Sequence, residues 1–253
     1  MKLARSILVA FPPMLLLVLS GPSAATDLLV SAAAGLTNAF TDIGREFENA
    51  HSGTKVILNF GGSGQLLQQI AKGAPVDVFA SADQETMDKA EAEGLVVVGT
   101  RADFVRNALV IVVSINSTIA VASLNDLTKS EIRYIAVGNP DSVPVGRYSK
   151  AALQAAGVWD ILQGKVVSTQ NVRQSLDYVA RGEVEAAFVY RTDAAILPKK
   201  VRIVLEVPTA SSVLYPIAIV QGGGGNSEAK EFVGFVHSGA AQKILRKYGF
   251  GKP

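Results

Sequence analysis

The chain has 253 residues, 49% of them hydrophobic, and it contains no cysteine, which excludes a disulfide framework and a thiolate metal site. Its formal net charge of +2 comes from the first 25 residues, which hold two of the 24 basic residues and none of the 22 acidic ones. The remainder is formally neutral, and this argues against the basic surface of a nucleic-acid-binding protein.

The N-terminal segment 1–25 has the features of a secretory signal peptide. Its two basic residues precede an apolar stretch from Ile7 to Leu19 and a group of small residues, 21–25. We expect cleavage near Ala25 and a periplasmic mature protein. An uncleaved anchor is the alternative, which the short apolar run with its Pro12-Pro13 pair disfavours.

The first part of the mature chain alternates between strand and helix patterns. Apolar residues 28–33 and the alternating segment 55–60 predict strands, and each leads through a glycine into a helical spacing of apolar residues. A third strand is expected at 77–80 and a third helix at 82–92. Strands that alternate with helices predict a mostly parallel sheet covered on both faces.

The second part repeats this alternation between two β-branched runs. These runs, 108–113 and 215–220, are expected to cross between two lobes. Between and after them we expect strands at 134–137, 165–167 and 186–190, and helices at 145–156, 172–181, 227–237 and 240–248. The sequence therefore predicts an α/β protein with two lobes, which suits closure around a ligand.

Four of the predicted turns are candidate anion sites, because each places a small residue between a strand and a helix. The first N–H groups of a helix have no intrahelical acceptor and lie at the positive end of its dipole. The candidates are Ala34-Gly35, Gly62-Ser63-Gly64, Val145-Gly146 and Asn171-Val172.

A series of motifs over nearly the whole mature chain resembles the periplasmic molybdate/tungstate-binding proteins of ABC importers. The motifs are AAAGLTNA (32–39), GAPVDVFASAD (73–83), GNPDSVPVGRY (138–148), NVR (171–173), FVYRTDA (188–194) and KYGF (247–250). The resemblance implies the type II periplasmic binding protein fold, with the ligand in the cleft between the lobes. We expect one lobe to comprise 26–107 plus 217–253 and the other 108–216.

The resemblance also implies a tetrahedral oxyanion held by neutral donors. Carried over by position, the ligand-binding residues are Gly35 and Ser63 from one lobe and Val145, Val172 and Tyr190 from the other. Ser63 would offer its hydroxyl and N–H, the two valines their backbone N–H groups, and Tyr190 its phenol.

Gly35 departs from the family pattern, which commonly has serine at this position. One hydroxyl donor is then missing, and Thr37 or a water molecule is the candidate substitute. We expect Gly35→Ser to keep or to tighten binding.

Each of these residues also has a structural interpretation. Ser63 could be a helix N-cap, and Tyr190 an ordinary core tyrosine at the end of a buried strand. Arg147, Arg173 and Arg191 lie beside the proposed site in sequence; they could contact the anion, but solvated positions on early helical turns are favoured.

Three classes of function are compatible with a chain of this size and composition. Transport binding is favoured, with molybdate or tungstate as the ligand and sulfate or thiosulfate as the alternative, a membrane permease and ATPase as partners, no cofactor and a monomeric state. An exported enzyme is disfavoured because His51 and His237 are the only histidines and no nucleophile-base or metal-ligand pattern is legible. A ligand-sensing regulator is disfavoured by the leader and by the lack of a DNA-binding region.

Overall fold

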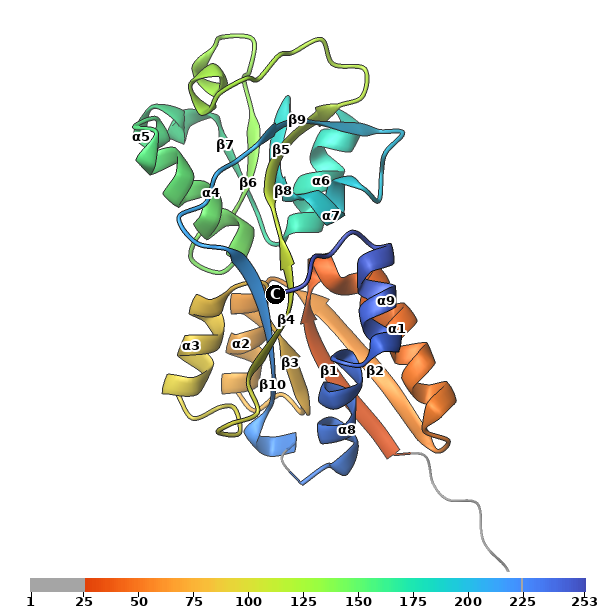
Figure 1. The fold of residues 1–253 in the computed structure, drawn as a ribbon. Helices are drawn as coiled ribbons and strands as arrows, with labels where there is room; N and C mark the ends of the chain where they lie inside the picture. Colours follow the sequence, from red (N-terminus) through yellow and green to blue (C-terminus); the bar gives the residue numbers. More distant parts are fainter. Residues whose placement is uncertain (1–25, 224) are drawn as a thin grey trace, which may run out of the picture.

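The computed structural model describes residues 26–223 and 225–253, and the predicted signal peptide lies outside the described residues. Two five-stranded sheets form two lobes, one above the other in Figure 1. The first sheet has the order β2-β1-β3-β10-β4. Its strands are β1 (Thr26–Ala33), β2 (Thr54–Gly61), β3 (Val78–Ala80), β4 (Ala102–Asn107) and β10 (Val213–Ile219).

The second sheet has the order β7-β6-β8-β5-β9. Its strands are β5 (Leu109–Ser114), β6 (Ile135–Gly138), β7 (Val166–Thr169), β8 (Ala186–Tyr190) and β9 (Val201–Glu206). In each sheet four strands run in one direction, and only β10 or β5 opposes its neighbours. The predicted mostly parallel α/β arrangement is therefore confirmed, with one antiparallel strand in each sheet.

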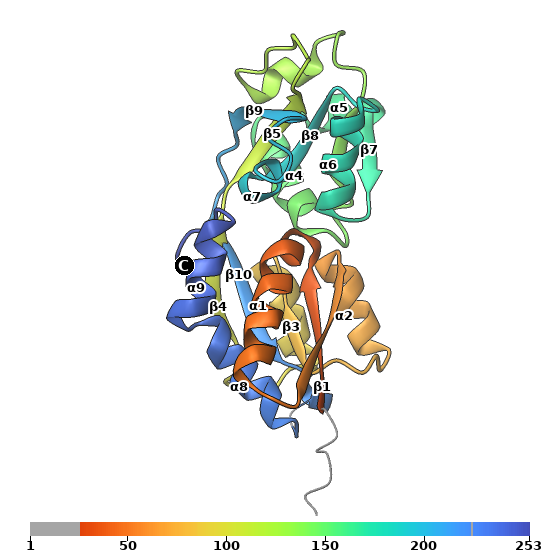
Figure 2. The same cartoon turned by 90° about the vertical axis from the view of Figure 1, so that its right-hand side faces the viewer.

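Helices cover both faces of the first sheet (Figure 2). One face carries α1 (Thr37–Ala50), α8 (Ser227–Val236) and α9 (Gly239–Lys247), and the other carries α2 (Ser63–Ala71) and α3 (Gln84–Ala92). The helical spacing of Phe40, Ile43 and Phe47 is explained because all three side chains are fully buried beneath α1. Phe47 packs edge-on against Phe232 of α8, with ring centroids 5.2 Å apart.

The second sheet is covered in the same manner. Helices α4 (Pro144–Ala155) and α5 (Trp159–Leu162) lie on one face and α6 (Val172–Arg181) on the other, followed after β8 by α7 (Arg191–Ala194). Short 3₁₀ turns complete the chain. They are η1 (Ala34–Leu36), η2 (Leu124–Thr128), η3 (Gln163–Lys165) and η4 (Gln221–Gly223).

The chain crosses between the sheets twice. Strands β4 and β5 are separated only by Ala108, and β9 is joined to β10 by residues 207–212. Strands β4 and β9 were not predicted from the sequence, and the expected boundary between residues 216 and 217 falls within β10. We therefore propose that the lobes are divided at Ala108 and at 207–212.

Candidate functional site

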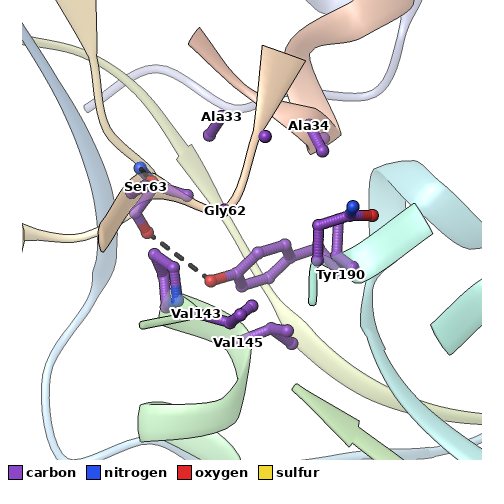
Figure 3. A pocket seen from close by; sticks show the side chains of 13 residues that line it. Ala33, Ala34, Gly62, Ser63, Val143, Val145 and Tyr190 are labelled. Atoms are coloured by element: carbon purple, nitrogen blue, oxygen red, sulfur yellow. Dashed lines mark hydrogen bonds between the residues drawn. The ribbon is translucent and has the colours of Figure 1, made fainter. Parts of the chain in front are cut away.

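A small pocket lies where the two lobes meet, and it contains all five residues expected to bind a ligand (Figure 3). Its cavity volume is only about 10 Å³, room for about one water molecule, so a sugar or a peptide does not fit in this arrangement of the lobes. The lining residues carry no formal charge. They are Ala33, Ala34, Gly35, Gly61, Gly62, Ser63, Ala82, Val143, Pro144, Val145, Asn171, Val172 and Tyr190.

Three helices begin at this pocket. Ser63 is the first residue of α2, Val145 the second of α4, and Val172 the first of α6. N–H groups in a first helical turn have no acceptor within their own helix, and the helix dipole adds partial positive charge there. The convergence of three such ends favours an anion, as expected for three of the four candidate turns, whereas the fourth, Ala34-Gly35, forms the η1 turn.

Ser63 is fully buried, and its hydroxyl oxygen accepts a hydrogen bond from another segment of the first lobe. The Ala82 N–H donates to Ser63 Oγ over 3.1 Å, which leaves the hydroxyl proton free to be donated elsewhere. The N-cap of α2 is Gly62, and no side-chain hydrogen bond caps this helix. The interpretation of Ser63 as an N-cap is therefore wrong.

Tyr190 ends strand β8, and its phenol points across the pocket toward Ser63 (Figure 3). Its side chain is buried, and its ring packs edge-on against Tyr215 with centroids 5.7 Å apart. The phenol oxygen lies 3.5 Å from the Ala82 carbonyl oxygen, at the outer limit of a hydrogen bond. Burial raises the pKa of Tyr190 well above its ordinary value, so the phenol keeps its proton and can serve as a donor.

Gly35 lies in the η1 turn, in front of a buried carboxyl group. A Cβ atom at Gly35 would stand 3.6 Å from both carboxyl oxygens of Asp193, an ordinary contact distance. Asp193 is fully buried, and its Oδ2 has no hydrogen-bond partner among the described residues. Burial raises the pKa of Asp193, and the adjacent Arg173 opposes that shift.

Thr37, the proposed substitute for the missing serine hydroxyl, does not reach the pocket. Its hydroxyl donates to the Ala34 carbonyl over 2.7 Å, and Thr37 is not among the lining residues. In this arrangement Thr37 therefore does not replace the hydroxyl donor that a serine at position 35 would supply.

The three arginines beside the site differ in their surroundings. Arg191 is 48% exposed and pairs with Glu206, as expected for a solvated residue. The same expectation is wrong for Arg147 and Arg173, whose side chains are only 13% and 22% exposed and pair with Asp83 and Asp193. The sequence could not reveal these pairs, because it does not show that Asp83 of the first lobe faces Arg147 or that Asp193 is buried beside Arg173.

Other kinds of site find little support. Among residues 26–223 and 225–253 there is no group of three or more histidine, aspartate or glutamate side chains placed to hold a metal ion. Within the same residues no helix has both the length and the apolar character that a membrane crossing demands.

Comparisons with known proteins give a consistent result. The profile of a family described as bacterial extracellular solute-binding protein matches residues 28–251. YvgL of Bacillus subtilis (strain 168) is 39% identical over 225 residues, which is 88% of this chain and 85% of that protein. The molybdate-binding protein ModA of Escherichia coli (strain K12) is 37% identical over 229 residues, 88% of each chain.

Solved structures share the same fold. The periplasmic molybdate-binding protein of Azotobacter vinelandii superposes with a TM-score of 0.78 at 24% identity, over 89% of this chain and 99% of that one. The sulfate-binding protein SubI of Mycobacterium tuberculosis H37Rv gives 0.79 at 20% identity, over 89% and 86%. The predicted two-lobed fold and the resemblance to molybdate-binding proteins are confirmed, and the chain belongs to the bacterial extracellular solute-binding protein family.

Proposed function

We propose that this protein is the extracytoplasmic substrate-binding component of a molybdate ABC importer, and that it captures molybdate or tungstate between its lobes. The observation that carries the proposal is the pocket itself. Three helix starts, a serine hydroxyl and a protonated phenol converge there, and no lining residue carries a formal charge. The curated relatives named molybdate-binding protein support the choice of ligand.

We propose that Gly35, Ser63, Val145, Val172 and Tyr190 bind the anion. Ser63 offers both its N–H and its hydroxyl, and each of the others offers one donor. A hydrogen bond to a charged group contributes about 1.5–3 kcal/mol, whereas micromolar affinity requires about 8.2 kcal/mol. About six donors can therefore suffice after the cost of ordering, with no cationic side chain touching the ligand.

Selection among anions follows from the shortage of acceptors. Ser63 Oγ already accepts the Ala82 N–H, so its remaining role toward a ligand is mainly that of a donor. A protonated phosphate brings an O–H group that needs an acceptor, whereas a fully ionised dianion does not. Sulfate and thiosulfate meet the same requirement, so discrimination against them has to come from how well the spacing of the donors fits each anion. The fold likeness to a sulfate-binding protein, at 20% identity, gives them no specific support.

We also propose where this chain acts and with which partners. Residues 1–25 would direct export to the periplasm and be removed near Ala25. The mature protein would act as a monomer that delivers its ligand to the membrane permease and ATPase of the importer, as a binding protein without catalytic activity or cofactor.

A thermal-shift panel tests this function, because a ligand that binds only the folded state raises Tm by mass action. The mature protein is heated with molybdate, tungstate, sulfate, phosphate or thiosulfate in excess. Molybdate and tungstate are expected to raise Tm most. Ser63→Ala should reduce the molybdate-dependent shift, because one charged hydrogen bond corresponds to about a tenfold loss of affinity or more.

Ser31→Ala is the matched control. Ser31 is equally buried in the same lobe and accepts a side-chain hydrogen bond from Asn59, but it does not line the pocket. Its molybdate-dependent shift should equal that of the wild type. A response to phosphate alone, or no response to any of the five anions, would contradict the proposal.

A further inference from the structure

Arg147 reaches from α4 in the second lobe to the start of α3 in the first. Its Nε donates to Asp83 Oδ2 over 2.7 Å, and a terminal nitrogen donates to Thr86 Oγ1 over 2.6 Å. Another nitrogen is held within its own lobe by the Pro140 carbonyl at 3.2 Å. Asp83 is almost fully buried and accepts the Thr86 N–H at the start of α3, so the group that Arg147 meets is firmly placed.

Arg173 makes a similar connection on another side of the pocket. Asp193, from its own lobe, accepts from Nε over 2.7 Å. The two terminal nitrogens donate to Asn38 Oδ1 at 2.9 Å and to the Gly35 carbonyl at 3.2 Å, both in the first lobe. Each arginine thus donates to one acceptor in its own lobe and to two acceptors in the other lobe.

Both arginines lie next to proposed ligand donors, and one of their acceptors, Gly35, is itself such a residue. Arg147 follows Val145 on α4, and Arg173 follows Val172 on α6. Their acceptors are equally close to the pocket, since Asp83 follows the lining residue Ala82 and Gly35 is itself a lining residue. Neither guanidinium lines the pocket, and each is paired with a carboxyl group.

We propose that Arg147 and Arg173 are positioning residues that latch the two lobes together and set the fraction of molecules that are closed. Opening the cleft breaks two hydrogen bonds at each arginine, whether or not a ligand is involved. The apparent affinity of a ligand scales with the fraction of molecules in the binding-competent state. This inference uses the proposed oxyanion function only for the choice of probe.

The test combines small-angle X-ray scattering without ligand and stopped-flow kinetics with molybdate as the probe. Arg147→Gln and Arg173→Gln should each increase the radius of gyration of the unliganded protein. They should also accelerate molybdate dissociation about tenfold or more while leaving the association rate nearly unchanged. Arg202→Gln is the matched control, because among the described residues Arg202 bonds only the Ser117 and Ile119 carbonyls, both within the second lobe.

A double variant separates the latch from a simple effect of charge. Arg147→Gln leaves Asp83 unpaired, and its negative charge could repel the anion. Asp83→Asn with Arg147→Gln removes both charges, and asparagine preserves the cap on α3. The latch predicts that this double variant still releases molybdate quickly; recovery of the wild-type dissociation rate would overturn it.

The scattering arm tests the latch even if no anion binds. Superimposable scattering curves for the wild type and both single variants would overturn the latch, whatever the ligand. Loss of compactness in the variants together with no response to any oxyanion would instead support the latch and contradict the proposed function.

Discussion

At the scale of single residues, the site depends on the backbone of Ala82, which contacts the Ser63 hydroxyl and the Tyr190 phenol. Its N–H donates to Ser63, and its carbonyl lies within reach of Tyr190. One peptide segment of the first lobe therefore orients a hydroxyl from its own lobe and a phenol from the other. The Ser63 hydroxyl keeps its proton for a ligand, and the phenol donates to the Ala82 carbonyl only at 3.5 Å, a weak bond that a ligand oxygen can replace. The pocket therefore favours an acceptor-rich anion.

Gly35→Ser tests the residue at which this chain departs from its relatives' pattern. A side chain fits here because the nearest atoms to a Cβ are 3.6 Å away, and the new hydroxyl would have Asp193 Oδ2 as an acceptor. We expect molybdate binding to be kept or tightened. Tm should rise by about 2–4 °C, which corresponds to about 1 kcal/mol in a protein of this size.

Titration calorimetry and thermal unfolding of the Gly35→Ser variant check these two expectations separately. Loss of all binding would contradict the placement of Gly35 at the ligand. A lower Tm would contradict the role of Asp193 as the acceptor for the new hydroxyl.

Asp193 should make stability depend on pH. Burial raises the pKa of Asp193 in the folded state above the ordinary value of 3.8. The stability that its protonated form contributes is therefore fully present at pH values below 3.8. The contribution is lost as pH rises through the folded pKa, because the unfolded chain ionises first. The unfolding free energy of the wild type minus that of Asp193→Asn should therefore fall as pH rises.

Urea unfolding of the wild type and Asp193→Asn at several pH values measures this difference. If the wild-type value minus the variant value rose with pH, the ion pair with Arg173 would outweigh burial. In that case the folded pKa of Asp193 would lie below 3.8 instead of above it.

At the scale of helices and strands, the turns between them bring the lobes together. The Gly64 N–H, in the first turn of α2, donates to the Ser142 carbonyl of the other lobe over 2.9 Å. A Cβ at Gly64 would lie 2.7 Å from that oxygen, and one at Gly62 would lie 2.7 Å from the Gln170 carbonyl oxygen. These two glycines allow backbone to meet backbone beside Ser63.

Gly64→Ala should therefore separate stability from binding. Alanine is the better helix former, so the Tm of the unliganded protein should be unchanged or higher. Molybdate affinity should fall about tenfold or more, because overpacking costs about 1–3 kcal/mol and arises only when the lobes meet. Calorimetry measures the affinity and thermal unfolding the stability.

Gly234→Ala in α8 serves as the control for Gly64→Ala. An added Cβ there would meet no atom of the described residues within 4 Å, apart from its own helix backbone and chain neighbours, so binding should not change. If Gly64→Ala bound molybdate as tightly as the wild type, the close approach of the lobes at this turn could not be required for binding.

Most elements could be predicted from sequence because their apolar spacing is regular. The bounds of α6 at Val172–Arg181 and of β8 at Ala186–Tyr190 agree with the predicted ranges. Strands β4 and β9 were missed because neither shows a long apolar run or a regular alternation: only Phe104 and Val105 are buried in β4, and only Val201 in β9. The two arginine bridges were missed for another reason, since a sequence does not indicate which residues of one lobe will face the other.

At the scale of the whole molecule, the two lobes divide the work of binding. The first contributes Gly35 and Ser63 to the pocket, and the second contributes Val145, Val172 and Tyr190. The positive charges nearby are paired with Asp83 and Asp193, and they span the cleft instead of lining it. We propose that ligand recognition rests on the neutral donors and lobe closure on the two arginines, with Gly35 the residue that the two groups share.

The most direct test of the account is a crystal structure of the mature protein grown with molybdate, in which anomalous diffraction locates the molybdenum. We expect one strong peak between the lobes, with its oxygens within hydrogen-bond distance of Gly35, Ser63, Val145, Val172 and Tyr190. No guanidinium should contact the anion. A peak bound by Arg147 or Arg173, or a peak outside this pocket, would contradict recognition by neutral donors.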